Sequence, residues 1–299
     1  MNAIVLTHGG ASARMEWADG CDAAAHAAMQ VLDAGQTALE AAIAAVNLLE
    51  GDGRFNAGKG SVLRMDGVSM EMDAALMDDA GHLAAVAGIR DIEHPILLAR
   101  EVLSTPHCML AGEGAIAFAR KRGFPEYRHQ PGLRARELHR QIMRELAEGD
   151  FTDMPQWADQ DWRRDWNFLT DPELAAGACD TVGAVVRDRH GHFAVATSTG
   201  GAAPMLRGRI GDAPLVGCGF FAGPHGGVVA TGIGEEITRR MVARSVYEGL
   251  AAGVDPESAC RRVLADFPDA WDLGILAVSA QGGAHVANRT MPVGREERS

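Results

Sequence analysis

A β-hairpin pattern begins abruptly at Thr181, and it restricts the possible folds of this chain more than any other feature. The run TVGAVVRD is separated from HFAVAT by a turn at Asp188 to Gly191. Near the C-terminus, GILAVSA and AHVAN repeat the pattern on either side of Gly282-Gly283. Apolar and β-branched runs that flank a short polar turn are typical of paired antiparallel strands. The last third of the chain is therefore expected to contain at least one sheet.

Helix patterns alternate with strand patterns in the rest of the chain. The run Ala3 to Thr7 predicts a buried strand, and residues 21–49 predict two helices that meet near Gly35, with Thr37 and Glu40 at capping-box spacing. Short strands over 68–88 and helices over 95–104 and 112–122 follow. A single helix is predicted over 234–249, with one apolar face formed by Ile237, Met241, Val242 and Val246. This order predicts an α+β fold in which two sheets are enclosed by helices, a four-layer α/β/β/α sandwich.

Residues from about 125 to 180 differ in character from the rest of the chain. They are polar, they lack β-branched runs, and their tryptophans lie among many charges. We expect a flexible linker with one helix over 133–148 and a mobile far end over 171–180.

The composition excludes several classes of partner. The chain has 28 Lys+Arg against 40 Asp+Glu and a net charge of -12, without basic runs, so nucleic acid is not expected to bind. No apolar stretch reaches the length of a membrane span, and the N-terminus does not resemble a signal peptide. Five unpaired-looking cysteines favour a reducing compartment, so we expect a cytoplasmic protein without a membrane partner.

Three common kinds of catalytic or binding site fail on particular residues. The loop from Gly53 to Gly60 nearly matches a phosphate-binding loop, but Gly60 lacks the hydroxyl that would bind magnesium, and the loop follows a helix instead of a strand. No H-E-x-x-H motif and no G-x-S-x-G motif is present. We therefore expect neither a catalytic metal nor a nucleotide cofactor.

Four motifs between Asp180 and Glu236 concentrate threonine, glycine, arginine and aspartate: DTVGAVV, ATSTGG, RGRIGDAP and ATGIGEE. Each alone has a structural explanation, since Thr and Val suit strands, Gly suits turns, and an Arg-Asp pair can be a surface ion pair. In this order, however, they resemble the plant-type L-asparaginase and isoaspartyl peptidase family of N-terminal nucleophile hydrolases. His8-Gly9-Gly10, FNAGKGSV, MEMDAALMD and HPILLAR match the family in order as well, so the resemblance covers nearly everything except about 125–179.

The resemblance implies that the chain cleaves itself between Asp180 and Thr181. An α-subunit of residues 1–180, including the linker, and a β-subunit of residues 181–299 would then form one folded domain with the sandwich of this hydrolase type. A threonine hydroxyl needs a base, and the freed α-amine of Thr181, with a pKa of about 7.7 to 8.0, would supply it.

The remaining site residues are also assigned by the resemblance. Thr199 would bond the hydroxyl of Thr181, while Thr231 and the Gly232 N–H would form an oxyanion hole. Arg209 would bind the substrate α-carboxylate, because a guanidinium and a carboxylate bond in a bidentate manner. The substrate-binding set is completed by Asp212 and Gly234 at the α-ammonium and by Asn56 near the nucleophile.

The family resemblance further suggests a structural sodium ion and a dimer of αβ units. The ion would be held by backbone carbonyls in a loop that includes Leu49, Glu50, Phe55, Ala57 and Lys59. No other cofactor is implied.

The expected reaction is hydrolysis of the β-amide of L-asparagine or of β-aspartyl peptides, two substrates that differ only in the leaving group. Asp180-Thr181 also resembles the glycosylasparaginase and taspase branches, so a glycosylasparaginase-like or otherwise specialised threonine hydrolase is one alternative. A non-catalytic relative that binds a small amino acid is the other, although binding alone would not require Thr181, Thr199 and Thr231 together. Ala11, where some relatives have a third glycine, leaves the rate of self-cleavage open.

Overall fold

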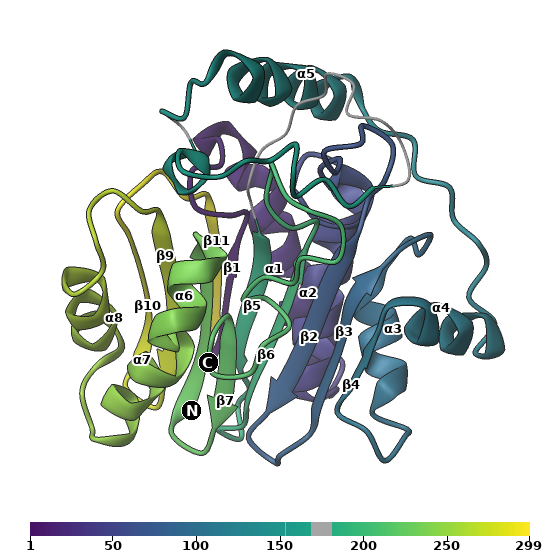
Figure 1. Ribbon diagram of the computed structural model, residues 1–299. Coiled ribbons are helices and arrows are strands. Elements are labelled where there is room, and N and C mark those ends of the chain that lie inside the picture. Colours follow the sequence, from purple (N-terminus) through teal and green to yellow (C-terminus); the bar gives the residue numbers. More distant parts are fainter. Residues whose placement is uncertain (153, 169–180) are drawn as a thin grey trace.

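The computed structural model describes residues 1–152, 154–168 and 181–299, and its strands form two sheets (Figure 1). The large sheet contains β1 (Ala3–His8), β2 (Met72–Asp78), β3 (Leu83–Ile89), β4 (Met109–Ala111), β5 (Thr181–Arg187), β6 (Phe193–Thr199) and β11 (Val293–Arg298). Its order is β11-β1-β5-β6-β2-β3-β4. The small sheet contains β7 (Phe220–Gly223), β8 (Gly226–Gly232), β9 (Leu273–Ser279) and β10 (Gly282–Ala287), in the order β10-β9-β8-β7. All pairings are antiparallel except that of β3 with β4.

Helices pack on both sheets (Figure 1). The large sheet is covered by α1 (Ala18–Asp33), α2 (Ala38–Asp52) and α3 (Pro95–Val102), with α4 (Gly112–Lys121) near β3. Beside the small sheet lie α6 (Gly234–Arg240), α7 (Val242–Ala251) and α8 (Pro256–Ala265). The remaining helix is α5 (Leu133–Glu148), and short 3-10 turns occur at Met15–Trp17, Gly58–Gly60 and Pro155–Trp157.

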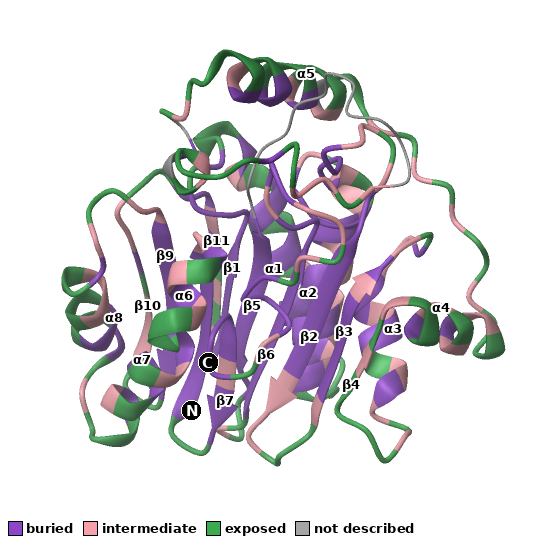
Figure 2. Cartoon of the chain, viewed as in Figure 1, coloured by how far each residue is buried: buried purple, intermediate pink, exposed green. Residues whose placement is uncertain are grey.

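The burial of the strands follows from their side-chain alternation. Along β5, Val182, Ala184 and Val186 belong to the core shared with α1–α3, whereas Val185 belongs to the core between the two sheets. Successive side chains of a strand point to opposite faces, so a strand that is apolar at every position is buried on both faces. Figure 2 accordingly shows the central strands buried along their length. A third core joins the small sheet to α6–α8.

The segment that was expected to be a flexible linker is packed as far as residue 168. The helix over 133–148 is confirmed, and it buries Ile142, Met143 and Leu146 in a cluster with Met65 and Trp162. Figure 1 shows α5 lying across one end of the molecule. Residues 169–180, which include the stretch expected to be mobile and Asp180, lie outside the described residues.

The break between the first two helices is confirmed at Gly35. This glycine has a φ of +78°, which a residue with a side chain rarely adopts. Thr37 then caps α2, because its hydroxyl oxygen accepts the Glu40 N–H at 3.2 Å.

The prediction of one continuous helix over 234–249 is wrong. The chain breaks at Met241, which has a φ of +47° and is half exposed instead of facing the core. The break lets a new helix begin beside the loop at 217–218, where the Ala243 and Arg244 N–H groups donate to the carbonyls of Cys218 and Gly217 at 3.0 and 2.8 Å. Tertiary bonds to this loop therefore replace the continuous helical ladder.

The turn of the second hairpin lies two residues earlier than expected. Gly282 already pairs with Ser279, so the turn consists of Ala280 and Gln281. The Ser279 hydroxyl accepts the Gln281 N–H at 3.1 Å, and this bond stabilises the tight turn without a glycine inside it.

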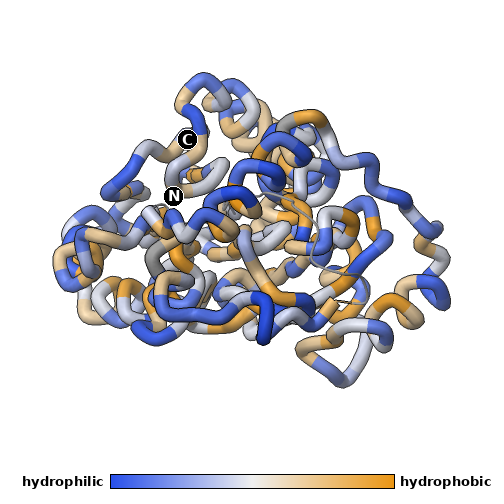
Figure 3. Tube along the Cα trace, turned by 45° about the horizontal axis from the view of Figure 1, so that its top comes forward, coloured by the Kyte–Doolittle hydropathy of each residue, from blue (hydrophilic) through white to orange (hydrophobic). Residues whose placement is uncertain are grey.

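The two ends of the chain lie side by side in Figures 1 and 3, because β1 and β11 are antiparallel neighbours with Ala3 opposite Arg298. Among the described residues, no helix has both the length and the apolar character needed to cross a bilayer.

Candidate active site

Thr181 is the first residue of β5, a central strand between β1 and β6. Because Val182 faces the helices, Thr181 faces the side of the small sheet. Thr199 is its Cα partner on β6, and the Thr181 hydroxyl donates to the Thr199 oxygen at 3.1 Å. Both side chains are buried. The sheet register therefore brings together two hydroxyls that are far apart in the sequence, while Asp180 lies outside the described residues.

A turn at Gly200-Gly201 follows Thr199, and the side chain of Asn56 stabilises it. The Gly201 N–H donates to the Thr199 hydroxyl at 2.9 Å, and the Asn56 amide donates to the Gly201 carbonyl at 2.7 Å. A Cβ atom at Gly200 would lie only 2.2 Å from the Asn56 oxygen, so glycine is required there. Asn56 thus supports the turn beside Thr181.

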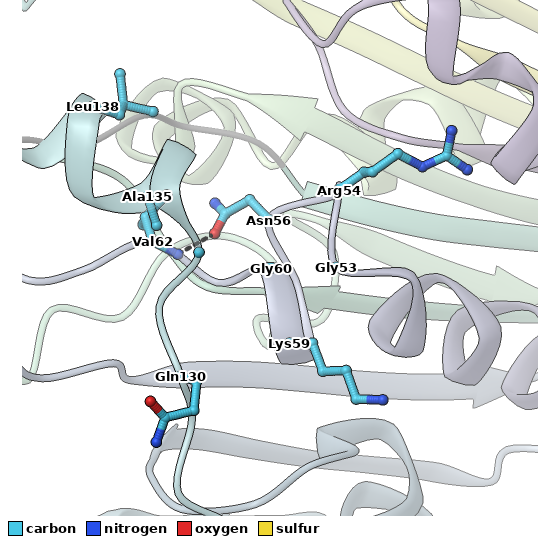
Figure 4. Close-up of a pocket in the computed structure, with 10 residues that line it drawn as sticks. Gly53, Arg54, Asn56, Lys59, Gly60, Val62, Gln130, Ala135 and Leu138 are labelled. Atoms are coloured by element: carbon cyan, nitrogen blue, oxygen red, sulfur yellow. Dashed lines mark hydrogen bonds between the residues drawn. The ribbon is translucent and has the colours of Figure 1, made fainter.

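Asn56 lines a separate cavity of about 270 Å³ between the glycine-rich loop and α5 (Figure 4). There its side-chain oxygen accepts the Val62 N–H at 2.9 Å, the bond that is dashed in Figure 4. The amide therefore spans the wall between this cavity and the turn at Gly200-Gly201.

A small recess opens at Thr181, with a volume of about 20 Å³, enough for one water-sized group. Six residues that the sequence singled out line it: Thr181, Thr199, Arg209, Asp212, Gly232 and Gly234. Gly201, Ala202 and Gly211 complete the lining and were not predicted. Thr231 and Asn56 do not line the recess.

Arg209 enters this recess and is paired with Glu235, not with Asp212. Its guanidinium donates to both carboxylate oxygens of Glu235, at 2.9 and 2.8 Å. Burial acts to raise the pKa of Glu235, but the bonds from Arg209 outweigh it and lower that pKa. A Cβ atom at Gly211 or Gly234 would lie 2.7 Å from a guanidinium nitrogen, so both glycines make room for the arginine. Nothing in the sequence distinguishes Glu235 from its neighbour Glu236.

Asp212 presents a buried carboxylate without a full set of partners. Its Oδ2 atom has no hydrogen-bond partner among the described residues. Burial raises its pKa to about 7, although the charge of Arg209 acts in the opposite direction. A buried carboxylate of this kind gains most from a cation that enters the recess.

Thr231 and Gly232 end β8 at the edge of the recess. The buried Thr231 hydroxyl accepts the Ala11 N–H at 3.2 Å, which ties the loop after β1 to the end of β8. Its own proton is still available to a second acceptor. Gly232 has a φ of +144°, and a Cβ atom there would lie 2.0 Å from the Asp272 carbonyl oxygen.

His8 is a buried residue near Thr181 that the sequence analysis mentioned only as part of a motif. It lies opposite Gly183 on β5, and a Cβ atom at Gly183 would lie 2.5 Å from its Nε2 atom. Its Nδ1 atom accepts the Gly10 N–H at 3.2 Å. Burial lowers the pKa of His8 to about 3, with the backbone of Thr181 acting in the other direction, so the ring is neutral. Its signals in the sequence were its position at the end of an apolar strand and the motif His8-Gly9-Gly10.

The expected cation loop is tightly folded. Cβ atoms at Gly58 and Gly60 would lie 2.5 Å from the Glu50 carbonyl oxygen and 2.0 Å from that of Phe55. The Glu50 carboxylate points elsewhere, since it accepts the Ile96 N–H at 2.9 Å at the start of α3. Across the described part of the chain, no group of three His, Cys, Asp or Glu side chains is placed to hold a metal.

The comparisons with known proteins agree with one another. The profile of a family described as asparaginase matches residues 1–296. An isoaspartyl peptidase/L-asparaginase of Danio rerio is 37% identical over 297 residues, which cover 95% of this chain and 88% of that protein. A plant-type L-asparaginase of Pyrococcus furiosus is 35% identical and covers 85% of this chain and 81% of its own length. An isoaspartyl peptidase/L-asparaginase of Mus musculus is 35% identical over 87% of this chain and 76% of its own length. By the extent of these matches, the chain belongs to the asparaginase family.

Proposed function

We propose that this protein hydrolyses the side-chain amide of L-asparagine and the β-amide of isoaspartyl peptides, and that it first cleaves itself between Asp180 and Thr181. The observation that carries the proposal is the recess in which the Thr181 hydroxyl, bonded to Thr199, lies with Arg209 and Asp212. A nucleophile and a pair of opposite charges in one small recess suit a zwitterionic amino acid with an amide side chain.

In the self-cleavage step, the Thr181 hydroxyl attacks the Asp180 carbonyl carbon. The peptide C–N bond breaks as the ester forms, and water hydrolyses the ester to give the Asp180 carboxyl group and a free Thr181 amine. That amine then accepts the proton of its own hydroxyl when the hydroxyl attacks a substrate amide. Ammonia or an amino acid leaves, and water hydrolyses the β-aspartyl ester to release aspartate.

The surrounding residues have separate roles in this proposal. Thr199 orients the nucleophile, while Thr231 and the Gly232 N–H donate to the oxygen on which negative charge develops. Arg209 binds the α-carboxylate, and Asp212 with the Gly234 carbonyl binds the α-ammonium. The partnerless Oδ2 atom of Asp212 supports this assignment, because an ammonium would supply the missing donor.

The proposal extends to the assembly and its surroundings. It includes the four-layer α/β/β/α sandwich of the N-terminal nucleophile hydrolases, with the α-subunit at 1–180, the β-subunit at 181–299, and a dimer of αβ units in the cytoplasm. A structural sodium ion would be held by carbonyls of the glycine-rich loop. Backbone carbonyls would suit this ion, since oxygen atoms are the preferred ligands of hard cations.

The decisive experiment for the cleavage is a denaturing mass measurement on freshly purified protein. We expect two fragments that divide at Asp180-Thr181. A single intact chain that nevertheless hydrolyses asparagine would overturn the proposed nucleophile.

Steady-state assays distinguish the substrate classes. L-Asparagine and a β-Asp-Leu dipeptide should be hydrolysed at comparable kcat/KM values, because only the leaving group differs. If the protein instead hydrolyses only a glycosylated asparagine, the glycosylasparaginase-like alternative holds. If cleaved protein binds aspartate without turning over any β-amide, it is a binding relative.

A further inference from the structure

Two buried carboxylates, Glu71 and Asp73, lie behind the loop that carries Arg209. Glu71 directly precedes β2, and Asp73 is the second residue of β2. Both residues are at least 95% buried. Neither lines the recess at Thr181. Because buried carboxylates are costly unless hydrogen-bonded, their partners indicate what they do.

Asp73 extends the row of side chains that begins at the nucleophile. It is the Cα partner of Thr199 on the next strand, and the alternation of Ala74 and Ala75 between two cores places it on the same face as Thr199. The pairing of β2 with β3 shifts at this residue, and Gly88 adopts a φ of +58° there. The shift frees the Gly88 N–H from the strand ladder, and it donates to Asp73 at 2.8 Å.

The other neighbour of Asp73 is the segment Gly208–Gly211, which carries Arg209 and is called the recognition loop below. Burial raises the pKa of Asp73 to about 6, and the Gly88 backbone, Arg64, Arg209 and the backbone of Gly211, directly before Asp212, act to lower it. Ile210 of this loop lies close to Gly88, since a Cβ atom on Gly88 would be 3.4 Å from the Cδ1 atom of Ile210. Asp73 therefore lies beside the C-terminal end of the loop.

Glu71 holds the N-terminal end. Its Oε2 atom accepts the Gly208 N–H at 2.7 Å and the Arg64 Nε–H at 3.2 Å. Arg64 is buried and also donates to the Gly200 carbonyl at 2.8 Å. The same network thus reaches the turn beside Thr199.

We propose that Glu71 and Asp73 are positioning residues that fix the two ends of the Gly208–Gly211 segment and thereby set the recognition of the substrate α-amino and α-carboxyl groups. The inference rests on the proposed function and deepens it. The loop contains two glycines in four residues, so its backbone is intrinsically free, and contacts with the two carboxylates replace the missing regular structure. Without them, the guanidinium of Arg209 loses its fixed distance from Thr181.

The test uses the full-length, self-cleaved protein and Asp73→Asn, a substitution that keeps the shape but loses one acceptor. We expect KM for L-asparagine to rise about 10-fold with kcat changed by less than about 3-fold, because the altered contact lies on the binding side of the site. Cleavage at Asp180-Thr181 should be unchanged, since it involves no free substrate. Glu71→Gln, which keeps an acceptor for Gly208, should raise KM by a smaller factor.

The matched control is Glu113→Gln. Glu113 lines the same cavity behind the loop as Glu71 and Gly208, but it is exposed and pairs with Arg90. Its substitution should leave KM and kcat unchanged.

The pH profile supplies a readout that a merely structural role would not move. Asp212 is faced by Arg209, by Glu235 on α6 and by Asp73 on β2, and the Asp73 charge acts to raise the pKa of Asp212. Removing that charge should shift the acid limb of kcat/KM to lower pH.

The outcomes separate the inference from the function on which it rests. If the wild-type protein hydrolyses no β-amide, the proposed function fails. If it does, and both variants fold with normal KM and an unshifted acid limb, the inference is wrong. Failure of both variants to fold, measured by loss of the thermal transition, would also overturn it, because Glu71 and Asp73 would then serve the fold and not recognition.

Discussion

The candidate site has two parts, one at Thr181 and one at Arg209, and they consist of different kinds of side chain. At the nucleophile, Thr181 and Thr199 are neutral hydroxyls on adjacent strands, and the neighbouring His8 is uncharged because of its burial. At the recognition end, Arg209 and Asp212 are charged groups on a glycine-rich loop. In the proposed mechanism, a sheet fixes the reacting atoms, whereas charges select the molecule that approaches them. The difference teaches that bond cleavage and substrate choice can be disabled separately.

The largest expected effect is at the nucleophile. Thr181→Ala should give one uncleaved chain and a loss of turnover of at least about 10⁴-fold, because no other described group in the recess replaces its hydroxyl. Thr181→Ser, which keeps a hydroxyl and can release an amine, should still cleave slowly. Denaturing mass spectrometry and an ammonia-release assay measure both effects. Cleavage of the alanine variant at the same bond would show that Thr181 is not the nucleophile of self-cleavage.

Thr231→Val should lower kcat by about 10²- to 10³-fold, the loss expected for one oxyanion donor. Valine also leaves the Ala11 N–H without its acceptor, so the thermal transition must be measured beside the kinetics. Thr231→Ser keeps the hydroxyl and is the matched control. Equal kcat values for the valine and serine variants would mean that the oxyanion hole lies elsewhere.

At the recognition end, Arg209→Lys should lower kcat/KM for asparagine by about 10²-fold while self-cleavage proceeds normally. Lysine keeps the charge but loses the planar fork that bonds a carboxylate in a bidentate manner. N-acetyl-asparagine should be a poor substrate of the wild-type protein for a related reason, because it leaves Asp212 without a cation. Normal kinetics of the lysine variant would show that the loop does not select the substrate.

The smallest effect is a pH dependence that separates the two ends. Asp212 must be ionised to bind an ammonium, and its pKa is raised to about 7, so kcat/KM should fall up to tenfold per unit as pH decreases below about 7. A bound ammonium would hold Asp212 ionised, so kcat should lack this limb and report only the Thr181 amine. Identical acid limbs in kcat and kcat/KM would assign the titration to the nucleophile end instead.

The sequence predicted helices and strands better than it predicted helix breaks and long-range packing. Strand and helix periodicity located the β5–β6 hairpin and α5. The helix break at Met241 was not predicted, because it depends on the carbonyls of Gly217 and Cys218, which reach α7 only in the folded chain. The packing of 125–168 escaped for a similar reason, since its apolar residues are sparse and find partners such as Met65 far away in the chain.

For the site, motif order located the residues that line the recess but not those that hold them. Glu235 and Asp73 look like ordinary acidic residues in the sequence. Asp73 did carry one signal, an ionisable residue within an apolar strand, which is rare unless the group is paired. Its partners on β3 and the recognition loop follow from sheet register and loop closure, which local patterns do not encode.

The strand order of the large sheet has a consequence for how the protein is made. The order alternates between the two prospective fragments, since β11, β5 and β6 come from one side of the proposed cut and β1, β2, β3 and β4 from the other. Because β11 is the edge strand beside β1, the sheet is complete only when residues 293–298 have left the ribosome. Maturation should therefore follow translation, and the cut pieces should remain interlocked and purify as one particle until a denaturant opens the sheet.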